Sequence, residues 1–389
     1  MSDLRPPNGS THDRAVRGRS EAGLERWVLA AWYGGGRLSL AQRAFVALMT
    51  PLGWWVGRVA AGRRLRAAKS AAAVSGLPPV IVIGNLTVGG TGKTPVVAWL
   101  AAALRARGVR VGLVSRGHGR DGRTERRVAS GDAPAEVGDE PAWLATTTGC
   151  PMAVGHDRRA AVALLAGEVD VVLADDGLQH HALPRRLEVI VVDVTRPRPL
   201  GNGRCLPAGP LREPTGFVGS SQVVLCNHGA LVDEMALAAP ANGNVPRPAN
   251  GMDRLAWAHA ATVLHFGVRA TRAVNLVTGE HRALAALGRA VAVAGIGNPE
   301  RFFEGLRVAG VELLTTRAFP DHHDYAPGEL AEWGVDAGAA SATPLLMTAK
   351  DAVKCAPFAL AHWWRVETEL VFAPGDGERL LERVLAAAL

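Results

Sequence analysis

A glycine-rich loop between a strand and a helix carries the residues with the clearest potential for chemistry. The segment 84–95 reads GNLTVGGTGKTP and follows the apolar run VIVI at 80–83. Glycines let successive backbone N–H groups turn toward an anion, and a helix N-terminus adds partial positive charge. Lys93 would reach the outer phosphates of a nucleotide, and the Thr94 hydroxyl would bind Mg²⁺. The pattern predicts a phosphate-binding loop, although Thr87 replaces the first glycine of the strict motif. The expected nucleotide contacts are Thr87, Val88, Gly89, Gly90, Thr91, Gly92, Lys93, Thr94 and Pro95.

A second polar cluster ends another apolar strand. Residues 169–174 read VDVVLA, and Asp175, Asp176, Gln179 and His180 follow. A carboxylate at a strand end beside a phosphate-binding loop is the arrangement that holds the ligand shell of Mg²⁺. An ordinary turn needs fewer such side chains. We therefore expect the two aspartates to bind Mg²⁺, and the glutamine and histidine to face the substrate.

Two further carboxylates, Asp139 and Glu140, precede a helical run at 142–148. Either could cap that helix, and the local sequence favours this interpretation. Beside a phosphate site the same pair could instead supply a general base or a metal ligand, and Glu140 is kept as a candidate Mg²⁺ ligand. A second polar group, DHHD at 321–324, is a candidate acid/base or orienting element, because adjacent histidines are poorly spaced to share one metal ion.

Four arginines occupy glycine-broken loops that should lie at the same edge of the sheet. The loop 116–120 reads RGHGR, and the segment 201–214 reads GNGRCLPAGPLREP. Long irregular loops rich in turn residues are often functional. The loop 116–120 could equally be a solvated turn, whereas the turn residues of 201–214 are expected to hold its two arginines in place. The candidate substrate-binding arginines are Arg116, Arg120, Arg204 and Arg212.

The elements that must position these residues alternate between strand and helix, which indicates an α/β fold with a mostly parallel sheet. Further strands are predicted at 109–115, 187–193 and 222–227. Segments 262–267 and 273–277 could pair as a two-stranded ribbon. A second strand–helix series begins at 289–294 and continues with a helix at 300–309 and strands at 311–316 and 343–347; a helix at 376–389 ends the chain.

Charge and composition divide the chain unevenly. The 389 residues carry a net charge of +7, yet 26–120 contains fourteen Lys and Arg and no Asp or Glu. The tryptophan-rich segment 27–61 precedes a cationic cluster, which favours a helix or helical hairpin in an anionic membrane interface over a helix packed on the domain. No nucleic-acid-binding pattern appears, and no apolar run reaches the roughly 20 residues of a spanning helix. The cluster consists of Arg58, Arg63, Arg64, Arg66 and Lys69.

Several common motifs are missing from the sequence, and their absence argues against a disulfide-bonded secreted protein and against a GTPase. Four scattered cysteines without a CxxC motif argue for a reducing compartment, and the polar first residues give no secretory signal. Asn227 is followed by His228, so the guanine-reading Asn-Lys-x-Asp pattern is missing and a GTPase is disfavoured. We infer no obligate protein partner.

These motifs together resemble one family, the tetraacyldisaccharide 4′-kinases, also called lipid A 4′-kinases. The resemblance runs in order from about residue 38 to the C-terminus, and Thr87 in the glycine-rich loop belongs to the family's own pattern. This chain has His118 where the family has Tyr, and Ala349 where it has Glu. The stretches that carry the resemblance are 84–95, 115–120, 138–141, 175–180, 201–214, 295–303, 319–323 and 348–354.

The resemblance implies transfer of the ATP γ-phosphoryl group to the 4′-hydroxyl of a tetraacylated glucosamine disaccharide 1-phosphate, giving lipid IVA in lipid A biosynthesis. It implies ATP and Mg²⁺ as cofactors and a peripheral location on the cytoplasmic face of a Gram-negative inner membrane. It assigns Asp139 as base, helped by His322, and thereby reverses the local preference for a cap. Rival interpretations are a P-loop partitioning or metallochaperone ATPase, although Val88 replaces its signature lysine, and a non-catalytic membrane-bound nucleotide sensor.

The resemblance also implies two α/β domains joined by a short β-ribbon. The predicted boundaries are 1–25 for a disordered extension, 26–75 for a membrane-interface helical segment, 76–255 for a P-loop kinase domain, 256–287 for the ribbon, 288–375 for the second domain and 376–389 for the last helix.

Overall fold

The computed structural model describes residues 23–34, 36, 38–70, 76–120, 122, 124–129, 131–231, 237, 262–333 and 342–388, without the side chains of 68–70. Two predictions fall outside these residues: the extension up to residue 22 and a Pro/Gly/Asn-rich linker expected at 239–250. Residues 23–25 were expected in the extension, but they begin a helix that runs to residue 33. The predicted domain boundaries stay a prediction.

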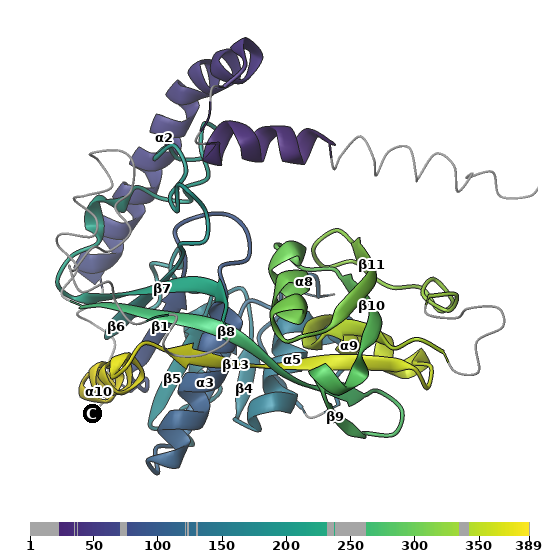
Figure 1. Ribbon diagram of the computed structural model, residues 1–389. Helices are drawn as coiled ribbons and strands as arrows, with labels where there is room; N and C mark the ends of the chain where they lie inside the picture. Colours follow the sequence, from purple (N-terminus) through teal and green to yellow (C-terminus); the bar gives the residue numbers. More distant parts are fainter. Residues whose placement is uncertain are drawn as a thin grey trace, which may run out of the picture.

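One mixed sheet runs through the described part of the molecule, in the order β11-β10-β12-β13-β8-β7-β6-β1-β5-β2-β4-β3, with β9 paired to β8 (Figure 1). Most neighbouring strands are parallel, and helices lie on both faces, so the α/β class is confirmed. The strands of the first half are β1 (Val80–Gly84), β2 (Val111–Ser115), β3 (Arg126–Val128), β4 (Met152–Val154), β5 (Val171–Asp175), β6 (Leu187–Asp193) and β7 (Gln222–Ala230).

The second half is connected to the first through two long strands. β8 (Thr262–Asn275) pairs in parallel with β7 and antiparallel with β13 (Trp363–Phe372). The predicted ribbon between 262–267 and 273–277 is therefore wrong, because 262–267 and 273–275 lie in the single strand β8. The antiparallel partners of β8 are β13 and the short strand β9. The remaining strands are β9 (His281–Ala283), β10 (Arg289–Ala294), β11 (Glu312–Ala318) and β12 (Leu345–Thr348).

Apolar side chains of alternating strand residues fill two cores in the first half. Ile81 and Ile83 of β1 face a core shared with α3, α5 and α10, whereas Val80 and Val82 face one shared with α6 and the loop to β7. Strands buried on both faces need continuous apolar runs, which explains why the sequence showed them clearly. The helices are α2 (Leu40–Ser70), α3 (Lys93–Ala106), α4 (Pro134–Val137), α5 (Asp139–Thr148), α6 (Arg158–Ala163), α8 (Pro299–Val308), α9 (Ala349–Cys355) and α10 (Asp376–Ala388).

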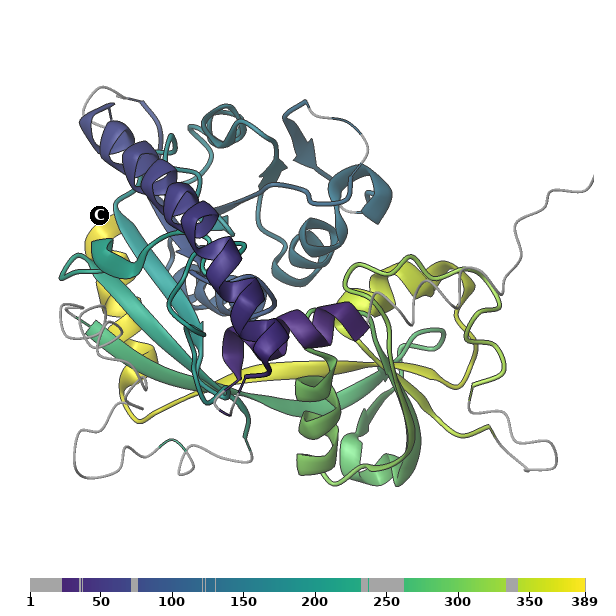
Figure 2. The same cartoon turned by 90° about the horizontal axis from the view of Figure 1, so that it is seen from above.

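The helix α2 projects from the body and crosses above the first half of the sheet (Figures 1 and 2). By length and composition its part Leu40–Ala67 could cross a membrane, and only 11% of its most apolar window is buried. The sequence indicated no apolar run of the length that a spanning helix needs. This helix nevertheless reaches that length and hydropathy, because isolated polar residues interrupt its apolar sequence without ending the helix. Its large exposed hydrophobic side chains are Leu40, Leu48, Leu52, Trp54, Trp55 and Leu65.

Candidate active site

The glycine-rich loop follows β1 and ends at Gly92, so Lys93 is the first residue of α3. Gly92 adopts φ of 92°, and a Cβ there would lie 2.5 Å from Nδ2 of Asn227, so the position requires glycine. The Lys93 ammonium donates to Oδ1 of Asn85 at 3.3 Å and lies 3.5 Å from Oδ1 of Asp176. Thr87 forms an isolated bridge to Leu211 and needs no left-handed backbone, which explains why a threonine fits.

The two aspartates that end β5 have opposite surroundings. Asp176 accepts hydrogen bonds from Nη1 of Arg212 at 3.0 Å. Burial alone would raise the pKa of Asp176, but the charges of Lys93 and Arg212 outweigh it and lower that pKa. Asp175 is 1% exposed, and neither of its oxygens has a hydrogen-bond partner among the described residues. Burial, aided by the nearby Glu140 carboxylate, raises the pKa of Asp175 to about 7.

A buried carboxylate without hydrogen-bond donors has the surroundings of a cation ligand. No group of three or more His, Cys, Asp or Glu among the described residues could hold a metal by protein atoms alone. Mg²⁺ in nucleotide sites takes few protein ligands and completes its shell with waters and phosphates, so this donor set suits it. The residues available are Asp175 and the hydroxyl of Thr94, with Asp176 and Glu140 beside them.

Asp139 lies at the start of α5 and is contacted from the second half of the molecule. Nδ1 of His322 lies 3.1 Å from its Oδ2, and Nζ of Lys354 lies 2.7 Å from the same oxygen. Burial alone would raise the pKa of Asp139, but these two partners lower it below its usual range. The expected cap is not observed, because Gly138 occupies the cap position and no side chain caps the helix.

The neighbouring Glu140 is paired with Lys350 at 3.5 Å, one helical turn before Lys354 on α9. Lys350 also lies 3.4 Å from Nε2 of His322, so both ring nitrogens have partners. With a lysine facing Nε2, the ring donates from Nδ1 to Asp139. The pair Lys350 and Lys354 could have been found from sequence, because residues four apart share one helix face.

His322 itself is held in an unusual conformation. Its φ is 62°, and with Asp176 it is one of two non-glycine residues with positive φ in the described part of the chain. Such conformations persist only where surrounding contacts enforce them, and they cluster at functional sites. His118, the departure from the family's Tyr, lies 5.0 Å from His322 between ring centroids.

The candidate substrate residues are only partly brought together. Arg212 and Gln179 join the phosphate site, whereas Arg204 donates to Thr50 of α2 at 3.1 Å instead. Arg116 is exposed, and Arg120 donates to the Thr124 carbonyl at 2.8 Å within its own turn. Burial and nearby Arg158 lower the pKa of His180 to about 4, so it is neutral at pH 7.

Sequence reasoning missed Arg158. This arginine begins α6, is 3% exposed, and its Nη1 has no partner among the described residues. Burial lowers its pKa to about 10, and Asp175 and Asp176 oppose that shift. No local pattern distinguishes it from Arg159, because only the fold brings it beneath the acidic strand end.

An apolar cavity of about 250 Å³ lies between the glycine-rich loop and the second half. One wall contains Gly90, Thr94 and Pro95, and the other contains Ile296 and Phe302. Ala349, the second departure from the family's pattern, also lines it. The lining also includes Glu140 and Lys350, so the cavity adjoins the ion pair between α5 and α9.

Comparisons with known proteins agree on one family. The model of the tetraacyldisaccharide-1-P 4′-kinases matches residues 45–387. A protein named tetraacyldisaccharide 4′-kinase from Pseudomonas aeruginosa is 42% identical over 354 residues, covering 89% of this chain and 93% of that protein. Another of that name, from Alkalilimnicola ehrlichii, is 46% identical over 314 residues, covering 78% and 81%.

Among solved structures, LpxK from Aquifex aeolicus in complex with ATP shares the fold. The TM-score is 0.67 at 22% sequence identity, and the match covers 89% of this chain and all of that one.

Proposed function

This chain belongs to the tetraacyldisaccharide 4′-kinase family, and we propose that the cleft between the glycine-rich loop and α9 performs its reaction with the residues described above. The activity is ATP-dependent phosphorylation of the 4′-hydroxyl of a tetraacyldisaccharide 1-phosphate in lipid A biosynthesis. The family match does not favour the partitioning ATPase or the nucleotide sensor. The contact of Asp139 with His322, beside a phosphate-binding loop, carries the assignment of the site.

Asp139 is the proposed general base. Its two contacts, to His322 and Lys354, are made through Oδ2, so Oδ1 is the atom that we assign to accept the hydroxyl proton. A carboxylate with a lowered pKa is a weak base, but phosphoryl transfer passes through a loose transition state in which proton removal can come late. The main tasks of Asp139 are then to orient the hydroxyl and take up its proton.

Lys93 and Mg²⁺ are proposed to stabilise the charge on the transferred group. Lys93 is held by Asn85 and Asp176 and so is aimed before nucleotide binds, which reduces the reorganisation that catalysis requires. Thr94 and Asp175 would hold the metal, with Asp176 and Glu140 as further candidates. When bound, Mg²⁺ supplies neutralisation of phosphate charge.

The apolar cavity is proposed to take the base of ATP. It lies beside Thr94 and Pro95, so a nucleotide with its phosphates on the glycine-rich loop can reach it. Ligand pockets typically combine apolar walls with a few polar groups, which matches this lining.

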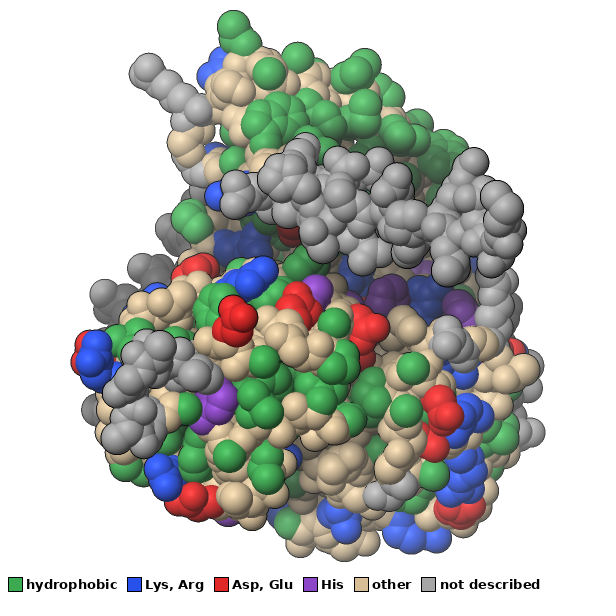
Figure 3. Space-filling view, turned by 90° about the vertical axis from the view of Figure 1, so that its right-hand side faces the viewer, with side chains coloured by type: hydrophobic (Ala, Val, Ile, Leu, Met, Phe, Trp, Pro, Cys, Tyr) green, Lys and Arg blue, Asp and Glu red, His purple; other side chains and the backbone are tan. Residues whose placement is uncertain are grey.

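The exposed side of α2 is proposed to dock on the inner membrane. Hydrophobic side chains gather on the projecting lobe in Figure 3, and Trp54 and Trp55 are 64% and 59% exposed. Isolated exposed apolar residues are ordinary, but a row along one helix marks a contact surface. Arg63 is exposed and suits anionic headgroups, whereas Arg64, which we expected to do the same, faces the protein.

Incubation with γ-labelled ATP and the disaccharide 1-phosphate tests the function. The expected product carries label at the 4′-oxygen, and Asp139→Asn abolishes most of it while binding of ATP persists. Label transfer to water alone, with no lipid product, would contradict the proposal.

Vesicle co-sedimentation across a salt series tests membrane docking. Binding to anionic vesicles should fall with salt but persist, because buried tryptophans contribute a term that salt does not screen. The double substitution Trp54→Ala with Trp55→Ala should remove most of the vesicle binding that persists at high salt. Arg63→Glu should remove the salt-sensitive part of the binding. A wild-type protein that stays in the supernatant at low salt would refute docking by α2.

A further inference from the structure

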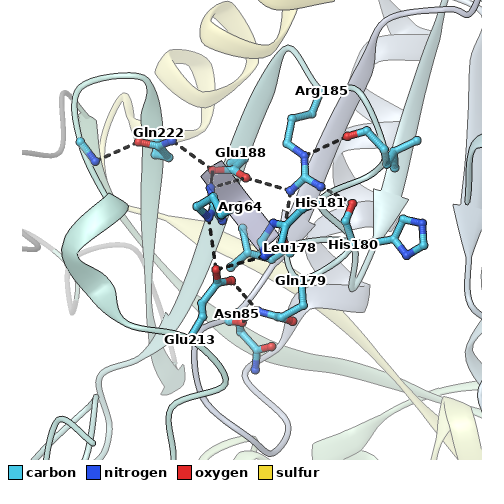
Figure 4. A network of polar contacts seen from close by, with 12 residues as sticks. Arg64, Asn85, Leu178, Gln179, His180, His181, Arg185, Glu188, Glu213 and Gln222 are labelled. Carbon is cyan, nitrogen blue, oxygen red and sulfur yellow. Dashed lines mark hydrogen bonds and ion pairs between the residues drawn. The ribbon is translucent and has the colours of Figure 1, made fainter. Parts of the chain in front are cut away.

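A buried network of polar contacts connects Arg64 of α2, through Glu213 and Gln179, to Asn85 of the glycine-rich loop (Figure 4). Arg64 of α2 donates from Nε to Oε2 of Glu213 at 3.2 Å and from Nη1 to both oxygens of Glu188 at 3.0 Å. Glu213 and Glu188 have side chains that are 1% and 5% exposed. Glu188 is also paired with Arg185 at 2.9 Å, whereas Arg64 is the only arginine or lysine paired with Glu213 among the described residues. Removing Arg64 therefore leaves the buried Glu213 carboxylate without its cation.

From Glu213 the contacts continue toward the acidic strand end. Nε2 of Gln179 donates to Oε1 of Glu213 at 3.0 Å, and Oε1 of Gln179 accepts from Nη1 of Arg212 at 3.3 Å. The same Nη1 holds Asp176, which in turn lies beside Lys93. Each side chain in this series is oriented by a hydrogen bond to the next. Loss of the Arg64 side chain is therefore expected to disturb the orientation of Arg212 and Asp176, which Arg64 does not contact.

The helix also packs directly on the segment that carries Arg212 and Glu213. A Cβ at Gly53 would lie 2.7 Å from the carbonyl oxygen of Cys205, and one at Gly57 would lie 3.3 Å from a carbon of Pro214. The segment is in turn tied to the glycine-rich loop: Arg212 N–H donates to the Leu86 carbonyl at 2.7 Å. It therefore lies between α2 and the phosphate site.

We propose that Arg64 is a positioning residue, which aligns Arg212 and Asp176 at the phosphate site through Glu213 and Gln179. This inference extends the proposed function, because it makes the seating of α2 a condition for an ordered phosphate site. Arg64 acts in this proposal through Glu213 and Gln179, and it is not itself assigned to the phosphate site.

The test compares Arg64→Met with Arg127→Met, which removes an exposed arginine–glutamate pair from the same half of the molecule. For Arg64→Met we expect kcat with γ-labelled ATP to fall about tenfold, with vesicle binding unchanged, since coupling within such networks has this scale. Arg127→Met should leave both unchanged. A purely structural role would lower the unfolding temperature of Arg64→Met and leave the kcat of the folded protein normal, which would overturn the proposal.

A double-mutant cycle tests the route. Arg64→Met combined with Gln179→Ala should lose about as much kcat as the worse single variant, because both break one series of contacts. Arg127→Met with Gln179→Ala should give multiplicative losses. Multiplicative losses for the Arg64 pair would refute the connection through Glu213.

Hydrogen exchange keeps the inference testable without turnover. Arg64→Met should speed exchange of backbone amides in 176–183 and 205–212, whereas Arg127→Met should not. If Arg64→Met does not fold, Gly53→Ala, which presses on the Cys205 carbonyl, should produce the same pattern. Unchanged exchange in these segments would overturn the inference, whereas a wild-type protein without lipid phosphorylation would overturn the proposed function instead.

Discussion

Two pairs of adjacent carboxylates flank the candidate phosphate site, and their partners differ. Asp139 and Glu140 at the start of α5 are each paired with a lysine of α9, from the other half of the molecule. At the end of β5, Asp176 is paired with Lys93 and Arg212 from its own half of the molecule, whereas Asp175 has no hydrogen-bond donor among the described residues.

The difference indicates what each pair can bind. A paired carboxylate stays ionised and fixed in direction, which suits a group that must orient a hydroxyl and accept a proton. A buried carboxylate without donors is unfavourable until a cation arrives, which suits a metal ligand. The pair on α5 also depends on the second half of the molecule, so the base is assembled only when the two halves meet.

The largest expected effect comes from substitutions at the phosphate and metal site, which includes the pair Asp175 and Asp176. Lys93→Ala and Asp175→Asn should each lower kcat roughly 100- to 1,000-fold, because charge on the transferred phosphoryl group loses its compensation. Steady-state kinetics with labelled ATP measures the loss, and circular dichroism verifies the fold. Near-normal turnover by a folded Lys93→Ala protein would remove the phosphate-site assignment.

A somewhat smaller loss is expected on the base side. Asp139→Asn and His322→Ala should each lower kcat by about 100-fold with little change in KM, since general-base assistance acts in the transition state. The double variant should lose less than the product of the single losses. Multiplicative losses would mean independent roles, and an effect on KM alone would return Asp139 to a binding role.

If Asp139 is the base, as proposed, removal of its partner Lys354 should shift the pH dependence of the reaction. Lys354 lowers the pKa of Asp139, so Lys354→Met should raise that pKa and move the acid limb of the kcat/KM profile to higher pH. At pH 7 the loss should be modest, because most of the carboxylate is still ionised. Lys350→Met is the matched control, since Lys350 is paired with Glu140 and its removal should shift the limb less. Equal shifts would mean that the base responds only to overall charge.

The smallest effect concerns stability of the metal-free protein. The pKa of Asp175 is about 7 in the fold against 3.8 as a free side chain, so below about pH 4 both folded and unfolded chains hold its proton. As pH rises toward about 7 the unfolded chain releases the proton first, and the free energy of unfolding falls. The melting temperature of wild type should therefore drop relative to Asp175→Asn between about pH 5 and pH 7, by a few degrees.

Magnesium with nucleotide should reverse that drop, because a cation stabilises the ionised carboxylate. A wild-type protein whose melting temperature follows that of Asp175→Asn across this range would show that Asp175 finds a donor in solution, and the comparison between the two pairs would fail.

The sequence alone determined the elements that close-range patterns dictate. The strand at 187–193 was predicted with its observed bounds, and the glycine-rich loop, β5 and α10 lie where expected. Strands buried on both faces and glycines before a helix leave strong local signals. Those signals also predicted that Lys93, Asp175 and Asp176 lie close together, because the carboxyl ends of parallel strands meet at one edge of the sheet.

Only the tertiary structure decided which residues meet across long separations. The family resemblance implied that His322 assists Asp139, but no residue near Asp139 in the sequence indicates this contact. The contact with Lys354, also from the other half of the molecule, was found only in the structure. Likewise, β8 could not be assigned its partner β13 from its own sequence. Arg63 and Arg64 are adjacent residues of the same type, so the sequence gives no reason to treat them differently. The packing of α2 exposes Arg63 to solvent and places Arg64 against two buried glutamates, which stabilise its charge.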